Sequence, residues 1–143
     1  MTTEPLHPDA QLILDDARKA TLATCKNSKL RAHYLKLVMM NNIMRAFVTM
    51  YDLNTSYRYA QEALLNALCR VETRRDRAWF TSDKVALEEA LFLYEELITA
   101  ADEEQLREVM EYVEFNRDAG QWGVLSRKSI KQTHNRLITE VFG

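Results

Sequence analysis

Glycine and proline are so rare in this chain that they restrict its secondary structure. The sequence holds three glycines and two prolines in 143 residues, whereas average usage would supply about 10 glycines and about 7 prolines. Tight hairpin turns depend on these residues, and the interiors of long helices exclude them. The scarcity therefore favours long helices with few turns and disfavours a sheet.

Apolar residues recur at three- and four-residue steps in every segment between short polar breaks, which is the spacing of one helix face. We therefore predict an all-α fold, a compact bundle of about six helices with short loops and no sheet. A chain of 143 residues fits a single domain, and we expect residues 1–7 to be flexible. The predicted helices cover residues 8–25, 28–53, 56–77, 82–101, 103–119 and 126–141.

Several residues mark where helices begin and which side faces inward. Ser28 is a good N-cap for the second helix. Asp102 with Gln105 three positions later resembles a capping box, which predicts a helix start at residue 103. The inward stripes are predicted to include Leu12 in the first helix and Val85 in the fourth.

The segment 28–53 is apolar over most of its circumference, and polar residues such as Asn42 fall on one narrow stripe. Such a helix either forms the centre of the bundle or is buried on two sides, one of them by a partner. Methionine is common on surfaces that adapt to a partner. This helix holds Met39, Met40, Met44 and Met50. We therefore predict a homodimer formed through this helix.

The chemistry-bearing residues do not form any enzyme signature that we can test. Phosphate-binding loops need several glycines, and only Gly120 and Gly123 are close together. The histidines, His7, His33 and His134, form no His-Glu-x-x-His or Glu-x-x-His pair of the kind that binds metal on helices. We therefore predict a non-enzymatic protein with no cofactor and no metal.

The two cysteines and the N-terminus bear on the compartment. Cys25 and Cys69 are far apart and belong to no Cys-x-x-Cys pair, which favours reduced thiols buried on helices. The first residues show no basic and apolar leader sequence. The longest stretches without Asp, Glu, Lys or Arg are eight residues, whereas a membrane helix needs about 20 apolar residues. We predict a cytoplasmic protein without a membrane partner.

The charge of the chain is unevenly distributed. A net charge of −2 conceals an acidic block at residues 81–118, which holds twelve acidic and three basic residues. A basic run precedes this block and consists of Arg70, Arg74, Arg75 and Arg77. Two interpretations of the block remain open: a solvated surface that pairs with the chain's own arginines, and a docking face for a basic protein surface.

Two aromatic residues favour the docking face. On the helical wheel, Phe92 falls between Glu88 and the pair Glu95 and Glu96, and Phe115 falls between Glu111 and Asp118. A large aromatic within a charged rim is typical of a binding surface, although a bundle that covers these faces more widely explains the same pattern. We predict a small regulatory, adaptor or inhibitor subunit that binds a protein with a basic surface. The predicted partner-binding residues are Glu88, Glu89, Phe92, Glu95, Glu96, Glu111 and Phe115.

The alternative function is that of a DNA-binding transcriptional regulator. Residues 126–139 resemble the recognition helix of a helix-turn-helix, with a glycine-containing turn before them and Ser126 as a cap. The residues that would contact nucleic acid are Arg127, Lys128, Lys131 and Asn135. The preceding acidic helix would repel DNA. An amphipathic terminal helix with a basic outer face explains the same residues. Its apolar stripe consists of Ile130, His134, Leu137, Ile138 and Val141.

Overall fold

The protein is a bundle of α-helices. The computed structural model describes residues 8–27, 33–74 and 78–118, and 88% of these residues are helical. The described part contains no strand, so the predicted all-α fold is confirmed. Its five helices are α1 (Pro8–Lys26), α2 (Tyr34–Met50), α3 (Thr55–Thr73), α4 (Thr81–Ala100) and α5 (Glu103–Asp118). The predicted sixth helix, 126–141, lies outside the described residues.

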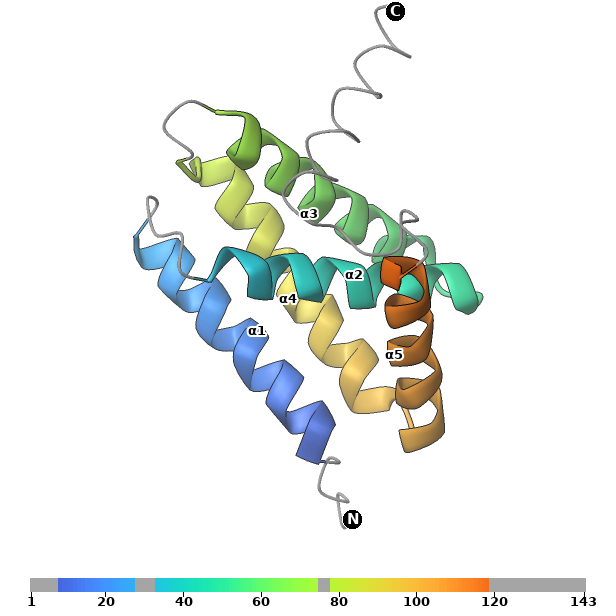
Figure 1. Cartoon of the computed structure of the whole chain (residues 1–143). Coiled ribbons are helices and arrows are strands. Elements are labelled where there is room, and N and C mark those ends of the chain that lie inside the picture. The colour runs from blue at the N-terminus through green and yellow to red at the C-terminus, as the bar shows by residue number, and fades with distance from the viewer. Residues whose placement is uncertain (1–7, 28–32, 75–77, 119–143) are drawn as a thin grey trace, which may run out of the picture.

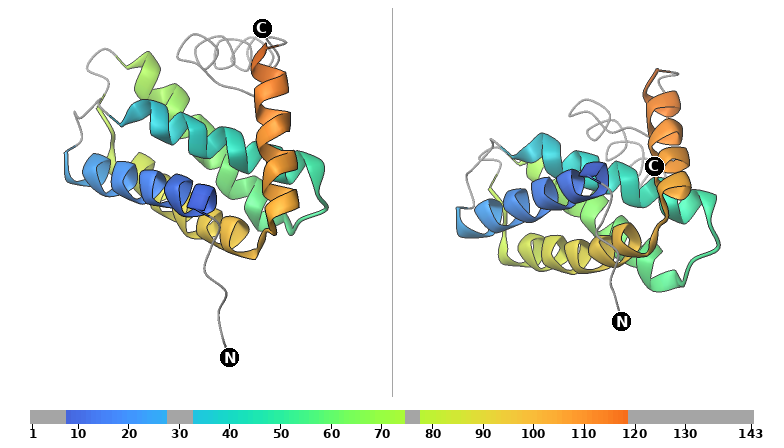
Figure 2. Two further views of the ribbon diagram at one scale, coloured as in Figure 1. Left: turned by 60° about the horizontal axis from the view of Figure 1, so that its bottom comes forward. Right: turned by 90° about the horizontal axis from the view of Figure 1, so that it is seen from below.

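Helix α2 lies at the centre of the arrangement and packs against each of the other four helices in the described part. Helix α4 packs between α1 and α3, and its inner side faces α2 (Figure 1). Helix α5 packs on α2 and stands across one end of the other helices (Figure 2). This order places α4 and α5 on different parts of the molecule.

The core follows from the central position of α2. Its residues Leu37, Met40, Ile43 and Met44 are at most 1% exposed. They pack with Leu14 of α1, Leu64 and Leu68 of α3, and Leu87, Tyr94 and Ile98 of α4. Burial of each such side chain stabilises the fold by about 1.5–3 kcal/mol. The wide apolar surface that the sequence shows on α2 is therefore used largely within the chain.

Asn42, on the polar stripe of α2, is 1% exposed. The reason is that helices surround α2, so polar residues are enclosed together with the apolar ones. The neighbouring Asn41 is also fully buried, and its side-chain oxygen accepts a hydrogen bond from Gln61 Nε2 of α3 at 2.9 Å. A buried polar group of this kind needs such a partner.

Two predicted inward residues are on the surface. Leu12 is 60% exposed and Val85 is 48% exposed. In α1 the inward side is instead formed by Ala10, Leu14 and Ala17, which lie on a face rotated away from Leu12. The periodicity predicted the helices correctly, but the predicted apolar stripes were wider than the buried faces. The neighbouring helices cover only part of the circumference of α1 and α4.

The helix ends agree with the sequence at α5. The Gln105 N–H donates to Asp102 Oδ1 at 2.8 Å, and the Asp102 N–H donates to Gln105 Oε1 at 3.0 Å. The predicted capping box is therefore confirmed. Helix α2 ends at Met50, earlier than the predicted residue 53, and its first residue is Tyr34. Ser28, the predicted cap, lies outside the described residues.

Candidate functional site

Two of the predicted partner-binding glutamates fix α4 between its neighbours. Arg18 Nε of α1 donates to Glu95 Oε1 at 2.7 Å, and this hydrogen bond raises the pKa of Arg18. The Tyr57 hydroxyl of α3 donates to Glu96 Oε2 at 3.0 Å, and this hydrogen bond raises the pKa of Tyr57. Glu95 and Glu96 therefore point to opposite flanks of α4, and each has a partner within the chain.

The contacts between α1 and α4 establish the register of these helices. Arg18 lies beside Glu95, and Cys25 lies beside Glu88. The contact residue in α1 rises by seven positions while its partner in α4 falls by seven. The two helices are therefore antiparallel. Leu22, midway between Arg18 and Cys25, is consequently level with the turn of α4 that contains Phe92.

An exposed apolar pair with carboxylates around it lies on this side of the molecule. Phe92 is 65% exposed and Leu22 is 58% exposed. Val85, Glu88 and Glu89 are exposed on the same face of α4, one and two turns before Phe92. We refer to Leu22, Val85, Glu88, Glu89 and Phe92 as the α4 surface. The sequence identified Phe92 and the two glutamates, but it missed Leu22, which becomes informative only once the register of α1 against α4 is known.

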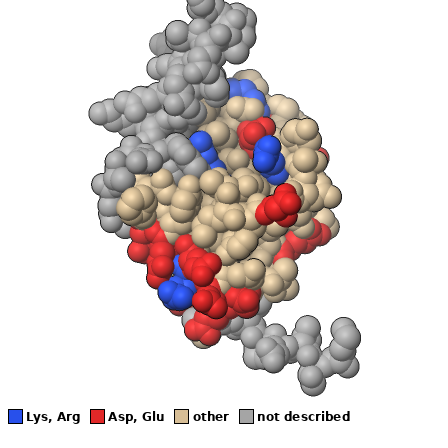
Figure 3. Space-filling view, turned by 90° about the vertical axis from the view of Figure 1, so that its right-hand side faces the viewer, with Lys and Arg blue, Asp and Glu red and all other residues tan. Residues whose placement is uncertain are grey.

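The predicted residues of α5 do not join the α4 surface. Glu111 and Phe115 are exposed, and Glu111 Oε1 accepts a hydrogen bond from Arg107 Nη1 at 3.1 Å. Because α5 packs on α2 and α4 turns its inner side to α2, their exposed sides face in different directions (Figure 2). Figure 3 shows acidic residues gathered at the lower end of the side on which α5 lies. The acidic block of the sequence thus forms two separate surfaces.

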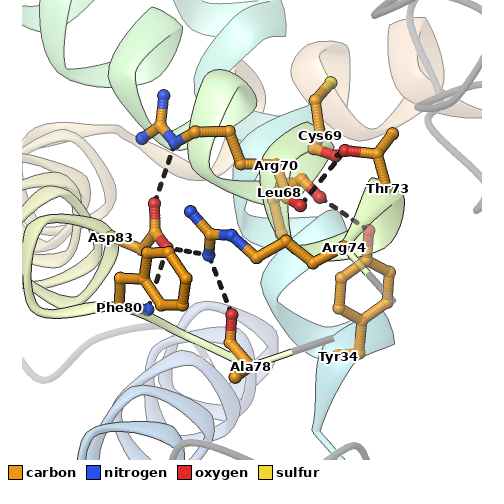
Figure 4. Close-up of polar contacts among 9 residues, drawn as sticks. All are labelled: Tyr34, Leu68, Cys69, Arg70, Thr73, Arg74, Ala78, Phe80 and Asp83. Carbon is orange, nitrogen blue, oxygen red and sulfur yellow. Dashed lines mark hydrogen bonds and ion pairs between the residues drawn. The ribbon is translucent and has the colours of Figure 1, made fainter. Parts of the chain in front are cut away.

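A buried carboxylate links the end of α3 to the start of α4 (Figure 4). The side chain of Asp83 is fully buried and forms ion pairs with Arg70, at 2.9 Å, and with Arg74. The Phe80 N–H donates to Asp83 Oδ2 at 2.9 Å. The guanidinium of Arg74 also donates to the Ala78 carbonyl at 2.8 Å and lies 3.5 Å from the centroid of the Phe80 ring.

This cluster is structural in character. Burial raises the pKa of Asp83, but the hydrogen bonds from Arg74, Phe80 and Arg70 outweigh burial and leave the pKa below its ordinary value. The carboxylate is thus held ionised by fixed donors, which leaves it poorly suited to proton transfer. The cluster also pairs Arg70 and Arg74 of the basic run with an acid of the block 81–118, as the first interpretation of that block expects for its arginine pairing.

Other kinds of site can be checked only within the described part of the chain. There, no group of three or more His, Cys, Asp or Glu side chains is placed to hold a metal ion. No helix among those residues is long and apolar enough to cross a membrane. The residues of the DNA-binding alternative, Arg127, Lys128, Lys131 and Asn135, lie outside it.

Comparisons with known proteins found no match: no protein-family model, no curated protein and no solved structure matches the chain.

Proposed function

We propose that this protein is a non-enzymatic interaction module, a small regulatory, adaptor or inhibitor subunit that binds a protein with a basic surface. The α4 surface is the proposed contact. The observation that carries the proposal is the exposure of Phe92, 65%, on a face that also holds Glu88 and Glu89. An exposed aromatic with charged residues around it has the composition of an interface anchor and its rim.

The energetic gain from covering Phe92 supports this use. A phenylalanine side chain offers about 200 Å² of surface, and 65% of it is exposed. Complete burial by a partner would therefore remove about 130 Å² of apolar surface from water and contribute about 3 kcal/mol. Leu22, 58% exposed and level with Phe92, would widen the same contact.

The carboxylates give the surface its selectivity. Glu88 and Glu89 are exposed, and Glu88 also lies beside Cys25 of α1, whereas Glu95 and Glu96 bond to Arg18 and Tyr57. An acidic field steers a basic partner towards the surface and speeds association, and it repels acidic proteins. Changing Glu88 and Glu89 to glutamine therefore tests electrostatic steering, because it leaves the contacts of Glu95 and Glu96 intact and keeps an amide oxygen at position 88 that can still accept from Cys25.

Photo-cross-linking in the source cells tests the proposal. A photoreactive phenylalanine analogue would replace Phe92 in one version and Tyr59 in a control version. Tyr59 lies on α3 and is 66% exposed, so it matches Phe92 in exposure. We expect one basic protein to be captured from position 92 and not from position 59. We also expect its yield to fall when Glu88→Gln and Glu89→Gln are introduced.

Two outcomes would contradict the proposal. Equal capture from positions 92 and 59 would mean that Phe92 is an ordinary surface residue. Undiminished capture after the two glutamates are neutralised would mean that charge does not select the partner.

A further inference from the structure

A second apolar surface lies between α1 and α5, away from the α4 surface. It is a groove of about 760 Å³. Its apolar lining consists of Leu12, Ile13, Leu106 and Met110. Leu12 is 60% exposed, so the groove has a large apolar side chain that the described residues leave uncovered. A groove lined in this way fits the apolar face of an amphipathic helix.

The rim of the groove is strongly acidic. Its carboxylates are Asp9 of α1 and Glu103, Glu104, Glu111 and Glu114 of α5. Arg107 is the one basic residue of the lining. It lies 3.1 Å from Glu111 and 3.8 Å from Glu104, so its charge is already shared with two of these carboxylates. The groove therefore favours a segment that is basic beside an apolar stripe.

The chain itself supplies a segment of this chemistry directly after α5. Residues 119–143 contain four basic residues and one acidic residue. Within them the apolar stripe Ile130, His134, Leu137, Ile138 and Val141 has helical spacing. On a helical wheel Lys131 falls at one edge of that stripe, Arg127 falls within it at its N-terminal end, and Lys128 falls on the opposite side. The segment thus complements the groove in its apolar pattern and in its net charge.

We propose that residues 126–141 of the same chain dock in the groove between α1 and α5 as an amphipathic helix. The apolar stripe covers Leu12, Ile13, Leu106 and Met110, and Lys131 at the edge of the stripe faces the carboxylates of the rim. This docking is independent of the α4 surface, because none of its residues belongs to that surface.

The length of chain after α5 suits this placement. Residues 119–125 are available to reverse direction, and connections of about 2–8 residues are usual between neighbouring antiparallel helices. A helix over 126–141 would be about 24 Å long, the same length as the 16 residues of α5 at about 1.5 Å per residue. The segment can therefore run back along α5 and reach the first turns of α1.

Carbodiimide coupling of the full-length protein tests the proposal, because it joins a lysine amine directly to a carboxylate that it touches. We expect Lys131 to couple to Asp9, Glu103, Glu104, Glu111 or Glu114, and we expect Lys128, on the opposite side of the helix, to couple less. We expect no coupling of these lysines to Glu88 or Glu89. Lys36 and Asp16, whose charged atoms are 2.9 Å apart, provide an internal positive control. Mixing unlabelled and ¹⁵N-labelled protein distinguishes coupling within one chain from coupling between chains.

A variant of the groove provides the second arm. Leu12→Ala with Met110→Ala truncates two of the four apolar side chains of the lining without adding a carboxylate, and alanine is compatible with both helices. Coupling of Lys131 to the rim should fall at least on the order of tenfold, as expected when two apolar side chains of the groove lose their contacts. Phe92→Ala, at a site of similar exposure, should leave it unchanged. Preserved Lys36–Asp16 coupling shows that the variant is folded.

Three results would overturn the proposal. The first is the absence of coupling between Lys131 and the rim while Lys36 and Asp16 couple normally. The second is coupling found only between labelled and unlabelled chains, which would assign the groove to a second copy. The third is coupling that survives the Leu12 and Met110 double variant.

Discussion

Replacing Asp83 by asparagine should destabilise the protein strongly without changing the shape of the side chain. The carboxylate is fully buried and ion-paired with Arg70 and Arg74. Asparagine can still accept the hydrogen bond from the Phe80 N–H, so the change removes the charge and little else. The two guanidinium groups would then face a neutral partner, and Arg74, whose side chain is 18% exposed, would remain largely buried.

The size of the effect follows from these exposures. Breaking a buried ion pair by removing one partner costs about 3–5 kcal/mol. The side chain of Arg70 is 42% exposed and can turn towards water, which reduces its share. We therefore expect a loss of about 3 kcal/mol in the free energy of unfolding. For a chain of this size that loss corresponds to a fall of roughly 6–12 °C in Tm.

Chemical denaturation followed by circular dichroism would measure this loss at several pH values. The pKa of Asp83 is lower in the folded protein than its ordinary value. The stabilisation that the Asp83 carboxylate contributes is therefore fully present above about pH 3.9, the pKa of aspartate in the unfolded chain. It is lost as the pH falls through the lower pKa of the folded protein. The difference between the wild-type protein and the Asp83→Asn variant should accordingly shrink in acid.

A matched control separates the buried pair from a surface pair. Asp16 bonds to Lys36 at 2.9 Å, but the two side chains are 34% and 55% exposed. Asp16→Asn should therefore change the stability by about 0–1 kcal/mol. If Asp83→Asn costs no more than Asp16→Asn, or if its cost does not depend on pH, the reasoning about the buried cluster is wrong.

Three further predictions concern the helix cap, the thiols and self-association. Asp102→Ala should cost about 1 kcal/mol in thermal or urea unfolding, whereas Asp102→Asn should be nearly neutral, because asparagine caps helices as well as aspartate does. Burial raises the pKa of both Cys25 and Cys69 to about 11. Both thiols should therefore react slowly with iodoacetamide at pH 8 until the protein is denatured. Rapid labelling of the native protein would contradict this prediction. The dimer predicted through α2 would have to use Leu35, which is 66% exposed, together with the half-buried Met39. Leu35→Asp should therefore dissociate the dimer, as measured by light scattering. A monomeric wild-type protein at micromolar concentration would refute the dimer.

The fold was predictable because its signals are local. Apolar spacing and the scarcity of glycine and proline predicted the helices, and Asp102 with Gln105 predicted the start of α5. The position of α2 was left open between the centre of the bundle and a partner interface. Only packing could decide this, because a helix that is apolar on most sides gives the same sequence pattern in both situations.

The surfaces were less predictable because they depend on which helices lie side by side. The sequence identified Phe92 within acidic residues but combined it with Phe115, which lies on another part of the molecule. It treated Glu95 and Glu96 like Glu88, although their partners Arg18 and Tyr57 come from distant segments. Leu22 was missed for the same reason. Pairings between distant residues are set by tertiary packing, and helical periodicity does not report them.

The dissociation rate of the Phe92→Ala variant from the captured partner protein tests the proposed function most directly. The exposed part of Phe92 corresponds to about 130 Å² of apolar surface, and its loss from the contact should cost about 2–3 kcal/mol. Dissociation should therefore become roughly 30- to 150-fold faster, while the association rate and the helical content stay nearly unchanged. Tyr59→Ala, on α3, serves as the control and should leave both rates as they are. If Phe92→Ala dissociates no faster than the control, Phe92 is not an anchor and the α4 surface is not the partner-binding site.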